Sequence, residues 1–83
     1  MRLLYFAWLR QKIGVAEETV VLPSEITTVG SLLTWLQARS DAHAEALSDL
    51  SVVRVAVNQD YAREADAVSD ADEVALFPPV TGG

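Results

Sequence analysis

The sequence predicts an α+β fold, a mixed sheet with one main helix packed on one face. Two observations support this class. Residues 29–36 carry apolar side chains at helical spacing, whereas residues 2–9, 17–22, 52–57 and 74–77 are rich in residue types that favour strands. The order is strand pair, helix, strand, short edge strand and final strand, which is typical of a sheet with helices on one side. The 83 residues, 51% of them hydrophobic, suffice for one domain with one core.

The first strand is expected over residues 2–9, which are apolar at nearly every position. Strand alternation places its side chains in two sets, Leu3, Tyr5 and Ala7 on one side and Leu4, Phe6 and Trp8 on the other. A turn over residues 10–16 leads to a second strand over residues 17–22, which we expect to form a hairpin with the first.

The helix signal is the clearest in the chain. Apolar residues fall at positions i, i+3, i+4 and i+7, namely Val29, Leu32, Leu33 and Leu36. Thr28 or Thr27 is the expected N-cap, because its hydroxyl can accept from an amide of the first turn. A weaker helical turn covers residues 41–47. We interpret His43 there as an exposed side chain, because no second ligand or nucleophile is spaced to meet it.

A third strand follows over residues 52–57, then a turn at 58–60, an edge segment around Tyr61 and the last strand over 74–77. Alternation gives Val74 and Leu76 one face of the last strand and Phe77 the other. If Val74 and Leu76 face the helix, Phe77 joins Phe6 on an open face, and an exposed apolar patch of this kind marks a protein interface. The alternative is a loosely covered second core.

Acidic residues at positions 70, 72 and 73 precede the last strand. The run lacks the further glycine and the distant glutamate of a helix-loop-helix calcium site, so we interpret it as a solvated turn and expect no metal site. The absence of cysteine removes disulfides, thiolate nucleophiles and zinc clusters. The formal net charge of −6 argues against nucleic acid or an anionic membrane as a partner. The apolar N-terminal run is too short to span a bilayer, so we expect a cytoplasmic protein.

The sequence ends in a stiffened diglycine tail, Leu76-Phe77-Pro78-Pro79-Val80-Thr81-Gly82-Gly83. We divide the chain into a domain over residues 1–77 and an extended tail over 78–83. The two prolines keep the tail extended, and six residues at about 3.3–3.6 Å each could reach roughly 20 Å. Gly82 and Gly83 have no Cβ, so they can enter a channel too narrow for other residues. The alternative, a frayed end, does not explain why the glycines follow a rigid double proline.

The chain resembles the sulfur-carrier small subunits of molybdopterin synthase, which are ubiquitin-like proteins of β-grasp fold. The resemblance covers essentially the whole chain. It is carried by Tyr5-Phe6-Ala7, by Val57-Asn58-Gln59 and above all by the run from Asp72 to Gly83, with its Pro-Pro-Val-Thr-Gly-Gly ending. One departure is Ala71, where the family's acidic turn has glycine, so we expect a rearranged or slightly strained turn there.

The resemblance implies that an ATP-dependent activating enzyme adenylates the Gly83 carboxylate, and that a sulfur donor protein converts it to a thiocarboxylate. The tail then enters the large subunit of a heterotetrameric synthase and gives its sulfur to a cyclic pterin monophosphate precursor. Gly83 is the reactive residue and Gly82 gives clearance, while the expected docking residues are Phe6, Phe77, Pro79, Val80 and Thr81. The chain itself would bind no cofactor and supply no catalytic side chain, so it is the sulfur-donating part of a sulfurtransferase complex.

The sequence is also compatible with three other functions. The first is a sulfur carrier for thiamine or tRNA thiolation, which shares the tail but serves a different acceptor. The second is a ubiquitin-like protein modifier joined through Gly83 to lysines of other proteins. The third is a binding module whose diglycine is inert.

Overall fold

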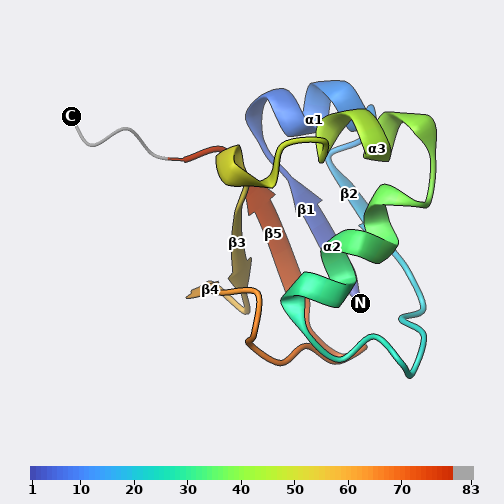
Figure 1. Cartoon of the computed structure of the whole chain (residues 1–83), viewed down its shortest axis with the longest axis vertical. Helices are drawn as coiled ribbons and strands as arrows, with labels where there is room; N and C mark the ends of the chain where they lie inside the picture. Colours follow the sequence, from blue (N-terminus) through green and yellow to red (C-terminus); the bar gives the residue numbers. More distant parts are fainter. Residues whose placement is uncertain (80–83) are drawn as a thin grey trace.

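Five strands form one mixed sheet in the order β2-β1-β5-β3-β4 (Figure 1). The computed structural model describes residues 1–79. The strands are β1 (Arg2–Tyr5), β2 (Glu17–Thr19), β3 (Arg54–Val57), β4 (Asp60–Ala62) and β5 (Glu73–Phe77). β1 and β5 are parallel neighbours at the centre, and every other pairing is antiparallel. The predicted mixed α+β sheet is therefore confirmed.

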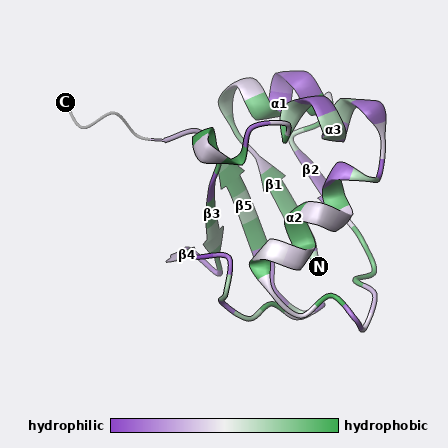
Figure 2. Ribbon diagram, in the orientation of Figure 1, coloured by the Kyte–Doolittle hydropathy of each residue, from purple (hydrophilic) through white to green (hydrophobic). Residues whose placement is uncertain are grey.

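The helices pack on one side of this sheet. They are α1 (Ala7–Ile13), α2 (Val29–Gln37), α3 (Asp41–Ala46) and a 3₁₀ turn, η1 (Leu50–Val52). α2 crosses in front of the sheet in Figure 1, and α1 and α3 lie together near the end of β1. Leu9 of α1, Leu33 of α2 and Ala46 of α3 share one core cluster with Leu3 and Leu76 of the central strands. Figure 2 shows β5 as hydrophobic along most of its length, as expected for the middle of a sheet.

The main helix begins where its capping residue predicts. The Thr28 hydroxyl accepts a hydrogen bond from the Ser31 amide at 3.2 Å, and the Ser31 hydroxyl accepts one from the Thr28 amide at 3.1 Å. This reciprocal pair satisfies two amides that a helix start leaves without partners. The four predicted stripe residues are buried: Val29, Leu32, Leu33 and Leu36.

The predicted first strand is wrong beyond Tyr5. Phe6 still donates its amide to Leu76, but Ala7 turns to a φ of 54°, and α1 occupies residues that we assigned to a strand and a turn. Leu9 and Ile13 stand four residues apart and both pack on the core, which is helical spacing. Gly14, at a φ of 97°, ends the helix. Trp8 is consequently a helix residue partly buried against the core, not an open-face residue.

The other boundaries differ less. The second strand pairs with the first as predicted but covers only Glu17–Thr19, and the third begins at Arg54 because Val52 belongs to η1. The turn at Asn58 and Gln59 is confirmed, with φ values of 50° and 73°. Ala71 is not among the residues at positive φ in the described part of the chain, so the turn has rearranged rather than strained at this position.

Candidate functional site

The face of the sheet opposite the helices, which we call the open face, is organised as three rows across the strands. The pairing register gives a middle row that begins with Glu17 on the edge strand β2 and continues through the apolar and aromatic residues Leu4, Ala75, Ala56 and Tyr61. A charged row at one end contains Arg2 and Glu73. A third row lies at the other end, next to the start of the tail. We call it the aromatic row, and it contains Phe77 and its cross-strand partner Arg54.

The structure places Phe6 and Phe77 at the tail end of this open face. Phe6 follows β1 in extended conformation and is 49% exposed. Phe77 ends β5 and is half-buried, while its neighbours Val74 and Leu76 are fully buried on the helix side. The alternation predicted for the last strand is therefore confirmed. Beside Phe77, the exposed side chain of Phe6 is available for contact with a partner.

Tyr61 is a residue of this face that we did not predict as part of the site. Its side chain is 78% exposed, and its ring centroid lies 5.8 Å from that of Phe77 at an interplanar angle of 54°. Such a tilted pair is a favourable aromatic contact. The sequence signal was available in the two-residue turn before β4, which sets Tyr61 opposite Ala56.

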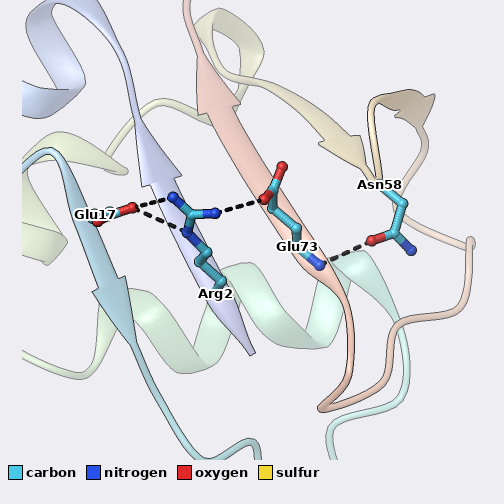
Figure 3. A network of polar contacts seen from close by, with 4 residues as sticks. All are labelled: Arg2, Glu17, Asn58 and Glu73. Carbon is cyan, nitrogen blue, oxygen red and sulfur yellow. Dashed lines mark hydrogen bonds and ion pairs between the residues drawn. The ribbon is translucent and has the colours of Figure 1, made fainter.

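The charged row is a chain of polar contacts across three strands (Figure 3). Arg2 donates to the Glu17 carboxylate from Nε at 3.0 Å and from Nη2 at 2.7 Å, and to Glu73 from Nη1 at 3.2 Å. The hydrogen bond and charge of Glu17 raise the pKa of the Arg2 guanidinium above its ordinary value. The Glu73 amide donates to the Asn58 side chain at 3.0 Å, which ties this row to the β3–β4 turn.

The tail leaves the sheet beside the aromatic row. Pro78 and Pro79 follow β5 directly and are half-buried. Pro79 lies two residues beyond Phe77 in the chain, and whether it docks with Phe77 stays a prediction. The remaining predicted tail residues, Val80, Thr81, Gly82 and Gly83, lie outside the described residues.

His43 is buried, so the interpretation of an exposed side chain is wrong. It is 7% exposed, and its Nε2 lies 2.8 Å from Oε2 of Glu18 while Nδ1 lies 2.7 Å from the Ser40 hydroxyl. The Tyr5 hydroxyl donates to the same Glu18 oxygen. Each polar group is thus satisfied by another, and neither pocket found in the described residues is lined by any of them. We interpret the cluster as a structural link between β1, β2 and α3.

The acidic residues before β5 also have structural partners. Asp70 accepts the Leu22 amide at 2.7 Å, and Asp72 accepts the Asn58 side-chain amide at 2.9 Å. These hydrogen bonds lower the pKa of both carboxyls below the ordinary value. No group of three His, Cys, Asp or Glu residues within residues 1–79 is placed to hold a metal ion. No helix in the same range is long and apolar enough to cross a membrane.

Comparison with protein families gives a full-length match. A family model described as "ThiS family" matches residues 3–83. The chain is 37% identical over 83 residues to the molybdopterin synthase sulfur carrier subunit of Escherichia coli, covering 100% of this chain and 99% of that protein. It is 39% identical over 85 residues to the protein of the same name from Chlamydomonas reinhardtii, covering 100% and 98%.

Solved structures agree. A Pyrococcus furiosus protein assigned as molybdopterin converting factor, subunit 1, superposes with a TM-score of 0.77 at 31% identity, covering 95% of each chain. Small archaeal modifier protein 1 of Haloferax volcanii superposes with a TM-score of 0.67 at 28% identity, covering 96% of this chain and 97% of that one. These likenesses confirm the predicted ubiquitin-like β-grasp fold.

Proposed function

We propose that this chain, which belongs to the ThiS family, is a sulfur carrier of molybdenum cofactor biosynthesis that donates sulfur from Gly83 within molybdopterin synthase. The observation that carries the proposal is the full-length likeness to molybdopterin synthase sulfur carrier subunits, with almost all of each relative covered. The open face supports it. Phe6, Phe77 and Tyr61 give a partner an apolar surface beside the point where the tail begins.

The chemistry requires an activated carboxyl carbon. An oxygen of the Gly83 carboxylate attacks the α-phosphorus of ATP on an activating enzyme, and pyrophosphate leaves. Sulfide (HS⁻) delivered by a sulfur donor protein then attacks the carbonyl carbon of this acyl adenylate, AMP leaves with the C–O bonding pair, and loss of the S–H proton leaves a thiocarboxylate. ATP therefore belongs to the activating enzyme, and the chain needs no cofactor of its own.

Transfer then takes place in the large subunit. The thiocarboxylate sulfur displaces an oxygen substituent from a carbon of the cyclic pterin monophosphate precursor, and that oxygen leaves with the C–O bonding pair. Water then cleaves the resulting acyl–sulfur bond, which leaves the sulfur on the pterin as a thiol and returns the Gly83 carboxylate. Proton transfers need a general acid and base held at the reacting atoms. We assign these groups to the large subunit. In the part of the chain that the structure describes, Glu18 and His43 already hydrogen-bond within the fold. We place these steps in the cytoplasm and expect two copies of each subunit in the assembly.

Intact-mass measurement tests the carrier role. Protein isolated from cells that hold the activating enzyme should gain the mass difference of one oxygen-to-sulfur exchange, and a variant lacking Gly83 should not. The truncated variant should unfold at the temperature of the parent. An unchanged mass of the parent under sulfur-replete conditions would contradict the proposal.

A second candidate function has one observation in its favour. The likeness to small archaeal modifier protein 1 supports attachment of Gly83 to lysines of other proteins. The two functions share the adenylate and differ in its acceptor, sulfur or an amine. Mass increases as large as a whole protein, found in the same cells, would indicate the modifier, and sulfur incorporation without such increases would indicate the carrier.

A further inference from the structure

The two ends of the open face carry opposite charge. In the charged row, the single cation Arg2 contacts two carboxylates, those of Glu17 and Glu73, within 3.2 Å. Among these three groups, two negative charges stand against one positive charge, so that end has an excess of negative charge. The row is visible in Figure 3 as one continuous chain of contacts.

Arg54 gives the other end its positive charge. It is exposed, and strand pairing sets it directly opposite Phe77, next to the start of the tail. Its Nη1 donates to two backbone carbonyls, those of Ser51 at 3.0 Å and Val53 at 3.3 Å. These acceptors hold the guanidinium in place but carry no formal charge, so its positive charge is not neutralised by them. The ion pairs found within residues 1–79 involve other cations.

The charges at the two ends of the open face are far enough apart for a binding partner to interact with each of them separately. Arg2 pairs with Glu73 and Arg54 pairs with Phe77, so the two arginines are four residue steps apart along β5. At about 3.3 Å per residue this is roughly 13 Å, which exceeds the Debye length of about 8 Å at physiological ionic strength. Between them, the part of the middle row that lies on β1, β5, β3 and β4 is apolar and aromatic. An apolar strip alone would bind a partner in either of two orientations. A strip with opposite charges at its ends favours the single orientation in which the partner's charges are complementary.

We propose that Arg54 is a specificity-determining residue of the open face, which pairs with a carboxylate of the synthase large subunit beside the entrance for the tail. The inference rests on the proposed function. The large subunit would present a cation to the Arg2 end, so that the reversed orientation brings like charges together and is rejected. Only the accepted orientation points the tail at the reaction site.

Calorimetric titration with the purified large subunit from the same source tests this. The chain offers Arg54→Glu, Arg54→Gln and a control, Arg10→Glu, which makes the same charge change on an exposed position of α1 in the helix layer. We expect Arg54→Glu to raise Kd at least about tenfold and Arg54→Gln about threefold to tenfold, as for charge pairs excluded from water at interfaces. Arg10→Glu should stay within about twofold. Thermal unfolding of all three variants verifies that the fold persists.

A second measurement identifies the partner group. Among Asp→Lys and Glu→Lys variants of the large subunit, one should bind Arg54→Glu more tightly than the parent chain, because the exchanged charges again match. A Kd of Arg54→Glu within about twofold of the parent would overturn the inference while leaving the proposed function intact. Failure of the parent chain itself to bind the large subunit would instead overturn the proposed function, and this inference with it.

Discussion

The imidazole of His43 lies 2.8 Å from the carboxylate of Glu18, a contact that joins α3 to β2 across 25 positions of the sequence. Glu18 also accepts the hydroxyl of Tyr5 from the neighbouring strand. One carboxylate therefore holds together two strands and a helix that covers them. The nearby Tyr5 and His43 rings meet edge to face at 6.1 Å, which adds packing to the polar contact.

Glu18→Gln should make the protein less stable and less sensitive to acid. Burial favours the neutral carboxyl, but hydrogen bonds from Tyr5 and His43 outweigh it and lower the pKa of Glu18 in the folded state. A lowered folded pKa gives stability that is complete above the unfolded pKa of about 4.3 and is lost as pH falls through the folded value. We expect the free energy of unfolding at neutral pH to fall by about 1–3 kcal/mol, because two buried groups lose a charged partner.

Urea unfolding measured from pH 7 down to pH 3 checks this prediction. The variant should lose less further stability below about pH 4.3 than the parent does. Glu25→Gln, at an exposed position, is the matched control and should follow the parent. An acid-induced loss for Glu18→Gln equal to that of the parent would show that the link carries no net electrostatic stabilisation.

Gln59→Gly should stabilise the protein by about 1 kcal/mol. Both residues of the β3–β4 turn have positive φ, and Gln59, at 73°, is a residue type that rarely adopts this region. Glycine adopts it without steric cost, which outweighs the extra entropy of the unfolded chain. The measurement is the midpoint of urea unfolding at an unchanged m value. Asn58→Gly is the informative comparison, because it relieves the same strain but loses the Asn58 hydrogen bonds to Asp72 and Glu73, so it should be destabilising.

Phe77→Ala should weaken binding to the large subunit more than it lowers stability. Phe77 is half-buried and contacts the exposed Tyr61, so we expect truncation to remove an interface aromatic rather than a core residue. Truncating an aromatic anchor at an interface commonly costs about 2 kcal/mol or more, which corresponds to roughly thirtyfold in Kd. The adjacent Leu76→Ala is the control, since Leu76 is fully buried and its truncation should lower stability by about 2–5 kcal/mol. A large fall in melting temperature with unchanged binding would move Phe77 into the core.

The parts of the fold that local patterns determine could be predicted from the sequence. The α2 stripe followed from its 3.6-residue period, and the open-face position of Phe77 followed from simple alternation along β5. The start of α1 could not, because residues 3–9 are apolar without either period. The change of direction depends on the positive φ of Ala7, a residue type that gives no signal for it.

The buried polar cluster around Glu18 could not be predicted from the sequence, for a different reason. Tyr5, Glu18 and His43 come from three elements, and their contact exists only once α3 packs over β1 and β2. Viewed alone, a histidine in a short polar helix favours exposure. The opposite charges of the open face could not be predicted either, because the strand register is needed to bring Arg2 opposite Glu73 and diagonally next to Glu17.

Gly82→Val should fold like the parent and fail at activation. The argument is local: valine is stiff at χ1, cannot adopt the backbone angles open to glycine, and adds a branched side chain one residue from the carbonyl that must meet ATP. β5 ends at Phe77, so the substitution lies five positions beyond the last strand and should not alter the melting temperature. Binding through the open face should persist for the same reason. The rate of pyrophosphate exchange with the purified activating enzyme should fall steeply for Gly82→Val. The rate for Gly82→Ala should lie between those of Gly82→Val and the parent. If Gly82→Val exchanged pyrophosphate at the parent rate, no narrow channel would surround Gly82, and the need for a diglycine would have to lie in a later step, at the sulfur donor or in the large subunit.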